Sequence, residues 1–201
     1  MNVGVLGGTF DPIHNGHLIV AEEVRAWLNL TGIILVPAGQ PSLKEGIPIS
    51  AAKHRVQMVR LAIAGKSYFE VSTVEIERPG PSYMVDTVAE LQKRFEADDE
   101  LFLILGWDSL AELPQWQEPS QLITMCHLVA VSRPGYSRPN LKKLEALIPG
   151  LSKRTVIMDE PVVDISASVI RDRLRQGLSV RHLVPESVNE YIKKHRLYVT
   201  D

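Results

Sequence analysis

Residues 7–17 read GGTFDPIHNGH, and they lie between a short apolar run at residues 2–7 and an amphipathic run at residues 17–30. The apolar run has the composition of a buried strand, and the amphipathic run carries apolar residues at helical spacing. The paired glycines Gly7 and Gly8 let the backbone turn tightly and approach a ligand closely. A buried strand, a glycine turn and a helix in this order predict the first strand-to-helix unit of an α/β protein.

The same alternation continues along the rest of the chain. Further strands are expected at residues 32–37, 69–74, 100–105, 127–132 and 155–158, and further helices at 51–64, 82–95, 166–176 and 185–195. Continuous apolar strands separated by helices are typical of a parallel sheet covered on both faces. We therefore expect an α/β fold with a doubly wound, Rossmann-like parallel sheet and helices on both faces. A length of 201 residues fits one domain, so residues 1–201 are expected to form a single domain.

The composition indicates an ordinary globular protein. The formal net charge is -2, from 22 basic and 24 acidic residues, so bulk charge gives no reason to expect a nucleic-acid partner. The single cysteine, Cys126, lies in an apolar run and cannot form an internal disulfide, so we expect a buried, inert thiol. The first residues lack the basic and apolar regions of a signal peptide, and no apolar stretch approaches the length of a membrane span. We therefore expect a cytoplasmic enzyme or binding protein with no membrane partner.

Three segments are candidates for chemistry, because ligands of doubly wound folds bind at the carboxyl ends of the strands. Residues 7–17 and 106–116 each follow a predicted strand, and residues 164–171 lead into a predicted helix. The fold class predicts that these distant segments meet. A further loop at 37–50, rich in proline and glycine, is either a lid or a surface connection.

His14 and His17 are three residues apart, so they share one face if the helix begins near Asn15 or Gly16. The amino end of a helix presents unpaired N–H groups and a partial positive charge. Two imidazoles there favour a site for a phosphate chain and for the charge that develops in phosphoryl transfer. Two such histidines can also be ordinary surface or cap residues, but the preceding glycine turn favours function. A zinc site is disfavoured, because no third ligand stands at a suitable spacing.

Two common nucleotide-binding fingerprints are absent. Residues 7–17 do not match the G-x-G-x-x-G pattern of dehydrogenases. The Gly-Lys-Ser at residues 65–67 follows a predicted helix, and Arg60 stands where a P-loop needs its first glycine. Neither pattern therefore accounts for the first loop.

The stretch at 7–17 resembles the H-x-G-H signature of the nucleotidyltransferase superfamily, whose core is similar to that of class I aminoacyl-tRNA synthetases. Residues 165–171, ISASVIR, resemble its second signature, I-S-S-T-x-I/V-R, with Ala167 and Ser168 in place of Ser-Thr. Independently of the family, a serine suits the amino end of a helix, and Arg171 in the first turns can neutralise polyphosphate with its fork of donors.

Three further segments resemble bacterial nicotinate mononucleotide adenylyltransferases. SYMVDT at 82–87 is similar to their S-Y-T-x-D-T stretch with Met84 in place of threonine, and GWDSLAELPQW at 106–116 is similar to G-x-D-x-x-x-x-L-x-x-W. The turn RPG at 133–135 matches their R-P-G. The lid segment QPSLK at 40–44 lacks the histidine that often stands beside the basic residue of that family.

The resemblance implies transfer of the adenylyl group of ATP to nicotinate mononucleotide, with Mg²⁺ bound together with ATP. It implies that His14, His17 and Arg171 are catalytic. The residues implied to bind ATP are Gly7, Gly8, Thr9, Phe10, Gly16, Gly106, Asp108, Ile165, Ser166 and Ser168. The residues implied to bind the acceptor substrate are Lys44, Thr87, Asp108, Trp116 and Arg133. Trp116 has the flat apolar surface on which a pyridine ring can stack.

The expected mechanism is direct in-line attack by the phosphate of the mononucleotide on the α-phosphorus of ATP, because that nucleophile is already an anion. No serine, cysteine or lysine constellation indicates a covalent intermediate. Two alternatives stay open: another acceptor, such as nicotinamide mononucleotide, or a non-catalytic nucleotide-binding protein on the same fold. A tRNA-related enzyme would need a further domain, for which 201 residues leave no room. The oligomeric state stays open, a homo-oligomer included.

Overall fold

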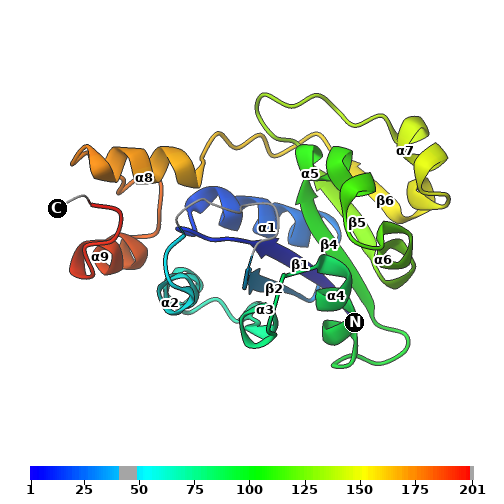
Figure 1. Cartoon of the computed structure of the whole chain (residues 1–201), viewed down its shortest axis with the longest axis horizontal. Helices are drawn as coiled ribbons and strands as arrows, with labels where there is room; N and C mark the ends of the chain where they lie inside the picture. Colours follow the sequence, from blue (N-terminus) through cyan, green and yellow to red (C-terminus); the bar gives the residue numbers. More distant parts are fainter. Residues whose placement is uncertain (41–48, 200–201) are drawn as a thin grey trace.

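The computed structural model describes residues 1–40 and 49–199. Within them the six predicted strands form one sheet, paired in parallel in the order β3-β2-β1-β4-β5-β6 (Figure 1). Their bounds are β1 (Asn2–Gly8), β2 (Gly32–Pro37), β3 (Phe69–Val71), β4 (Glu100–Gly106), β5 (His127–Val131) and β6 (Thr155–Met158). This confirms the doubly wound α/β fold and its single domain. Lys44 and most of the predicted 37–50 loop lie outside the described residues.

Helices connect the strands and cover both faces of the sheet. The described helices are α1 (Asn15–Trp27), α2 (Ala52–Ala62), α3 (Val74–Glu77), α4 (Met84–Gln92), α5 (Trp107–Glu112), α6 (Pro119–Met125), α7 (Leu141–Leu147), α8 (Ala167–Arg175) and α9 (Glu186–Lys194). Two short 3-10 helices, Leu113–Gln115 and Leu151–Arg154, complete the connections. Each predicted helix is present, and its ends lie within a few residues of the predicted ones.

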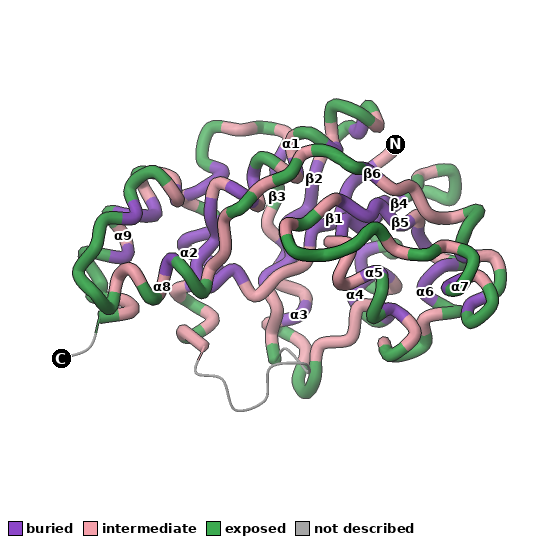
Figure 2. Tube along the Cα trace, turned by 90° about the horizontal axis from the view of Figure 1, so that it is seen from above, coloured by how far each residue is buried: buried purple, intermediate pink, exposed green. Residues whose placement is uncertain are grey.

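Alternation along the strands builds a separate core on each face of the sheet. On β1 and β4, Leu6 and Ile104 pack into the core shared with α1, α2, α8 and α9. Their neighbours Val5 and Leu103 pack into the core shared with α4, α5, α6 and α7. Figure 2 shows the strands buried between exposed outer segments. Burial on both faces explains why the strands are continuously apolar.

The strand order reverses between β1 and β4. From β1 the chain builds outward to β2 and β3, then returns to pair β4 with β1, and Leu6 lies opposite Ile104 in that pair. The loops that follow two such strands diverge to opposite sides and leave a crevice at their carboxyl ends. The first loop and the segment after β4 therefore border the same space.

Several short elements differ from the sequence prediction. The strand predicted at 69–74 ends at Val71, and residues 74–77 form α3 instead. The segment 106–116, predicted as a loop, contains α5 and a 3-10 turn. Helices α6 and α7, of seven residues each, were not predicted. Helices this short span about two turns, so their apolar periodicity is too brief to distinguish from a loop.

The segment that follows β2 approaches the backbone of α3 closely at Gly39. A Cβ atom added at Gly39 would collide with the main-chain carbonyl of Glu75, and the Gly39 N–H donates to the Ser82 hydroxyl at 3.1 Å. We expect Gly39→Ala to lower the free energy of unfolding by about 1–3 kcal/mol, because backbone must move to make room. Gly7→Ala is the matched control, since its Cβ meets only the end of the Met84 side chain. Equal losses of thermal stability in the two variants would contradict this reading.

Candidate active site

A cavity of about 750 Å³ opens at the carboxyl ends of β1 and β4, where the strand order reverses. It brings together all three segments that the sequence marked as candidates. The predicted site residues that line it are Gly7, Gly8, Thr9, Phe10, His14, Gly16, His17, Gly106, Asp108, Trp116, Arg133, Ile165, Ser166 and Arg171. Residues more than 150 positions apart in the chain thus share one wall.

Three predicted residues are not in the described wall. Lys44 lies outside the described residues. Ser168 is exposed, and its hydroxyl lies 3.1 Å from that of Ser166 without lining the cavity. Thr87 is fully buried, and its hydroxyl donates to Glu75 Oε1 at 2.8 Å. Glu75 lines the cavity and Thr87 does not. This arrangement therefore does not favour direct contact between Thr87 and a ligand.

The amino ends of two helices face the cavity. His14 has an extended conformation and is the N-cap of α1. Ser166 is the N-cap of α8, where its side chain accepts a hydrogen bond from the Val169 N–H at 3.3 Å. Each helix end carries a partial positive charge and N–H groups that favour anions. The cavity is therefore suited to a phosphate chain.

His14 and His17 stack on one another at the start of α1. Their ring centroids are 3.6 Å apart and the rings are inclined by 21°. The main-chain N–H of His14 donates to Nδ1 of His17 at 3.2 Å. Because Nδ1 of His17 accepts this bond, the neutral ring carries its hydrogen on Nε2. His17 is thereby fixed as a donor in the tautomer that suits a phosphate oxygen.

The two histidines differ in burial. His14 is 5% exposed, and its Nδ1 has no hydrogen-bond partner among the described residues. Burial, and to a smaller extent the positive charge of Arg133, lower the pKa of His14 to about 4. A Cβ at Gly16 would lie 3.0 Å from Nδ1 of His14, so a glycine leaves room for this ring. His14 is therefore a neutral imidazole near pH 7.

The ring of Phe10 packs against His17 of the histidine pair. Its backbone is in the left-handed region, with φ at 50°, and its side chain is 2% exposed. The ring meets that of His17 edge to face, with centroids 5.0 Å apart. A left-handed bulky residue costs about 1–3 kcal/mol and persists only where the surroundings hold it. The packing around Phe10 therefore holds the first loop in a conformation that the isolated chain would rarely adopt.

Arg133 and Asp108 form an ion pair on the opposite wall. Nη1 of Arg133 donates to Oδ2 of Asp108 at 2.5 Å, while Oδ1 of Asp108 is buried without a partner among the described residues. A side chain at Gly106 would collide with that Oδ1. Trp116 lines the same wall, and its indole N–H is also buried without a described partner. This wall offers a flat ring, a carboxylate and a guanidinium.

Three residues of the site were not singled out from the sequence, namely Asp11, Arg55 and Glu75. Asp11 and Glu75 line the cavity as buried carboxylates. Arg55 is 2% exposed and donates to the carbonyl of Thr9 at 2.8 Å. A signal existed for Arg55: it stands three, four and seven residues before the buried Met58, Val59 and Ala62, so it occupies a core position of its helix.

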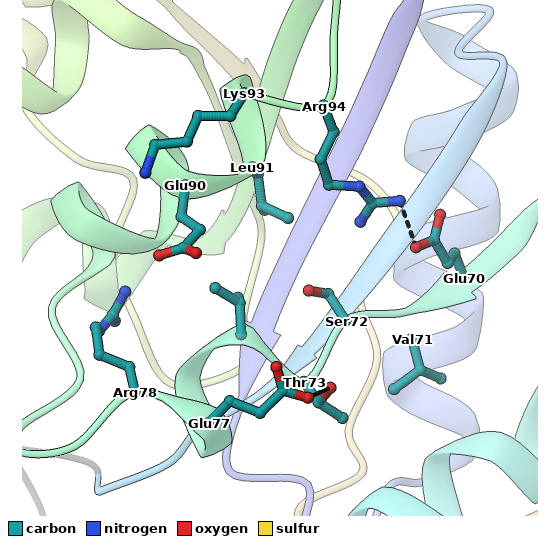
Figure 3. Close-up of a pocket in the computed structure, with 11 residues that line it drawn as sticks. Glu70, Val71, Ser72, Thr73, Glu77, Arg78, Glu90, Leu91, Lys93 and Arg94 are labelled. Carbon is teal, nitrogen blue, oxygen red and sulfur yellow. Dashed lines mark hydrogen bonds and ion pairs between the residues drawn. The ribbon is translucent and has the colours of Figure 1, made fainter.

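A second cavity, of about 600 Å³, lies between the end of β3, α3 and α4 (Figure 3). Acidic and basic side chains share its wall, and several are paired with one another. Arg94 donates to Glu70 at 2.6 Å, and the Thr73 hydroxyl donates to Glu77 at 2.5 Å. None of the predicted site residues lines it. The mixed charge offers no focus for a phosphate chain, so the first cavity is the candidate site.

No group of three or more His, Cys, Asp or Glu side chains within residues 1–40 and 49–199 could hold a metal ion. No helix in the same residues is long and apolar enough to cross a membrane.

The chain matches the family model described as cytidylyltransferase-like over residues 5–173. A relative from Dehalococcoides mccartyi, named "Probable nicotinate-nucleotide adenylyltransferase", is 49% identical over 98% of this chain and 97% of its own length. A relative of the same name from Roseiflexus sp. is 44% identical, with the same coverage of both chains. The chain belongs to the cytidylyltransferase-like family, in the group named nicotinate-nucleotide adenylyltransferase.

Solved structures share the fold of this family member. Nicotinic acid mononucleotide adenylyltransferase from Plasmodium falciparum, complexed with NaAD, superposes with a TM-score of 0.77 and 18% identity over 98% of this chain and 97% of that one. The same enzyme complexed with APC gives a TM-score of 0.74 and 19% identity, over 98% and 96% of the two chains. At this identity the likeness shows the shared fold.

The burial of His14 makes the stability of this family member depend on pH. Between pH 6.5 and about 4 the unfolded chain takes up a proton on His14 that the folded protein does not. This contribution to stability is therefore present above pH 6.5 and is lost as the pH falls towards 4, by up to roughly 1.4 kcal/mol per pH unit. Urea unfolding across this range should show a shallower pH dependence for His14→Asn than for the unaltered protein. Identical pH dependences would show that His14 is not held neutral by the fold.

Proposed function

We propose that the protein transfers the adenylyl group of ATP to nicotinate mononucleotide, giving nicotinate adenine dinucleotide and pyrophosphate in NAD biosynthesis. The observation that carries this function is the stacked His14–His17 pair at the amino end of α1, facing Arg171 of α8 across one cavity. The names of the relatives support the same reaction, as do the complexes of the Plasmodium falciparum enzyme with NaAD and APC.

The ATP phosphates occupy the part of the cavity between α1 and α8 in this proposal. His17, with its hydrogen on Nε2, donates to the α-phosphate, where negative charge grows during the reaction. Arg171 lines the same region and supplies a permanent positive charge. His14 stays neutral, so it contributes a ring surface and a hydrogen bond rather than a charge. The glycines at the end of β1 let the phosphates approach the backbone.

The reaction is a direct in-line displacement. A phosphate oxygen of the mononucleotide forms a bond to the α-phosphorus of ATP, and the bond from that phosphorus to the oxygen that bridges the α- and β-phosphates breaks, so that pyrophosphate leaves with that oxygen. The nucleophile enters as an anion, so no general base is required. The protein then accelerates the reaction by holding two anions in line and by stabilising the charge on the transferred group.

The acceptor occupies the part of the cavity that follows β4 and β5. Trp116 offers its ring for stacking with the pyridine ring. Arg133 is half exposed, so its guanidinium can exchange its pairing with Asp108 for an anionic group of the acceptor. The cavity also contains the hydroxyl-bearing residues Ser82 and Tyr83 and the carboxylate of Glu75. This wall is where a nicotinate and a nicotinamide acceptor would be distinguished.

Magnesium accompanies ATP in this proposal. The ion lowers the negative charge of the triphosphate and of the leaving pyrophosphate. Asp108 fits a supporting role, because its Oδ1 has no partner among the described residues and Mg²⁺ binds one or two carboxylates along with phosphate oxygens. We also propose that the enzyme works in the cytoplasm, in keeping with the sequence.

The decisive experiment measures pyrophosphate release with ATP and Mg²⁺, and compares nicotinate mononucleotide, nicotinamide mononucleotide and phosphopantetheine at equal concentration. A strong preference for the nicotinate form is expected. Preference for another acceptor would keep the ATP chemistry and overturn the assignment of the acceptor. Tight ATP binding without pyrophosphate release would instead favour the non-catalytic nucleotide-binding alternative.

Replacing His17 tests the ATP half of the site. His17→Ala removes the donor to the α-phosphate, and we expect kcat to fall roughly a hundredfold or more, as when one oxyanion donor is removed. His127→Asn is the control, because His127 lies at the amino end of β5, whereas the cavity lies at the carboxyl ends of the strands and is not lined by His127. A loss below about threefold for His17→Ala would be inconsistent with a transition-state contact, which such a deletion normally reveals.

A further inference from the structure

The carboxylate of Asp11 lies at the centre of the first loop, and other segments of the protein engage both of its oxygens. Asp11 is 4% exposed. The hydroxyl of Tyr198 donates to Oδ1 at 2.6 Å, and the main-chain N–H of Ser50 donates to Oδ2 at 3.1 Å. A buried carboxylate is stable only when its oxygens are paired in this way. The loop that carries His14 is therefore tied to residues 39 and 187 positions further along the chain.

Asp11 also contacts Arg171 directly. Nη1 of Arg171 donates to the main-chain carbonyl oxygen of Asp11 at 2.8 Å. This bond fixes one edge of the guanidinium against the first loop. A displacement of Asp11 would therefore move Arg171 as well as the loop that leads to His14.

Tyr198 is held in place independently of Asp11. It follows α9 and has a left-handed backbone, with φ at 66°. The N–H of the preceding residue, Leu197, donates to the Ile192 carbonyl of α9 at 3.0 Å. Helix α9 packs against α2, and its buried Val188 and Ile192 belong to the core shared with that helix. Burial, and then the negative charge of Asp11, raise the pKa of Tyr198 well above its usual range. The phenol therefore keeps its proton and acts as a permanent donor to Asp11.

Arg55 of α2 holds the first loop from a second side. Its Nη1 donates to the Thr9 carbonyl at 2.8 Å and its Nε to the Ser50 carbonyl at 3.0 Å. Its positive charge also offsets the negative charge of Asp11. Thr9 and Asp11 are thus fixed on either side of the strained Phe10, and the Tyr198 contact comes from the segment after α9.

We propose that Tyr198 is a positioning residue for the phosphate site: its hydrogen bond to Asp11 sets the first loop and, through the Asp11 carbonyl, the placement of Arg171. This role rests on the proposed function, because the phosphate site is the one assigned to ATP. Small displacements of groups that orient reactants reduce rates strongly. We therefore expect this hydrogen bond, which we call the Tyr198–Asp11 clasp, to affect turnover as well as folding. Tyr198 lies outside the cavity wall, so it exerts this effect through Asp11 rather than by contact with the substrates.

The test compares two variants that each remove one hydroxyl from the same part of the chain. Tyr198→Phe breaks the bond to Asp11, whereas Tyr191→Phe breaks only the contact with His54. We expect kcat to fall about tenfold for Tyr198→Phe, in line with the cost of misplacing a reacting group, and to stay unchanged for Tyr191→Phe. Both are assayed well below their melting temperatures. Unchanged kcat in Tyr198→Phe, or an equal loss in Tyr191→Phe, would overturn the proposal.

A double-variant cycle tests the route through Arg171. If Tyr198 acts by placing Arg171, adding Tyr198→Phe to Arg171→Lys should cost clearly less than it does in the unaltered protein. If the loss of kcat in the double variant equals the product of the two single-variant losses, Tyr198 does not act through Arg171 and that route is wrong.

Calorimetric titration of ATP separates this proposal from the proposed function. Tyr198→Phe should bind ATP several-fold more weakly than Tyr191→Phe, whatever acceptor the enzyme uses. If the protein binds ATP but releases no pyrophosphate, the proposed function is wrong. The comparison of ATP affinities in the two variants still tests the role of the Tyr198–Asp11 hydrogen bond in that case. Equal ATP affinity in the two variants would overturn the clasp even in an active enzyme.

Discussion

The turn from β1 into α1 is the constraint on which the rest of the structure depends. Within a few residues the chain must leave the sheet, take a left-handed step at Phe10, bury the carboxylate of Asp11 and start a helix at His14. Buried polar groups of this kind must find partners elsewhere in the protein. Tyr198, after α9, and the Ser50 N–H donate to the Asp11 carboxylate, and Arg55 of α2 donates to the Thr9 carbonyl. The shape of the first loop is thus stabilised by contacts with segments from the middle and the end of the chain.

The attraction of the site for phosphate arises from geometry rather than from bulk charge. The whole chain has a formal net charge of -2, and His14 is neutral near pH 7. The positive potential comes from the amino ends of α1 and α8 together with Arg171. Both oxygens of Asp11 accept hydrogen bonds, from the Tyr198 hydroxyl and the Ser50 N–H, so these protein groups stabilise its negative charge. A neutral composition therefore conceals a site suited to anions.

Sequence reasoning recovered what depends on local patterns. Buried strands, amphipathic helices and the Ser166 cap each follow from the residues next to them, and the crevice follows from the strand order. It missed what depends on distant contacts. The burial of His14, the bond from Tyr198 to Asp11 and the position of Thr87 behind Glu75 are settled by packing between elements. No periodicity within one segment encodes such contacts. Arg55 lies between these cases, because its place among the apolar positions of α2 was visible but its partners were not.

In our proposal the two substrates occupy different parts of one cavity, which opens where the strand order reverses. The ATP side is built by the loop after β1 and by the start of α8, while the acceptor side is built by segments that follow β4 and β5. A change at Trp116 can therefore alter the fit of the acceptor without disturbing the histidine pair. Conversely, the clasp on Asp11 can tune ATP placement without reshaping the acceptor wall. A fold built in this way can keep one phosphate chemistry while its acceptor side changes.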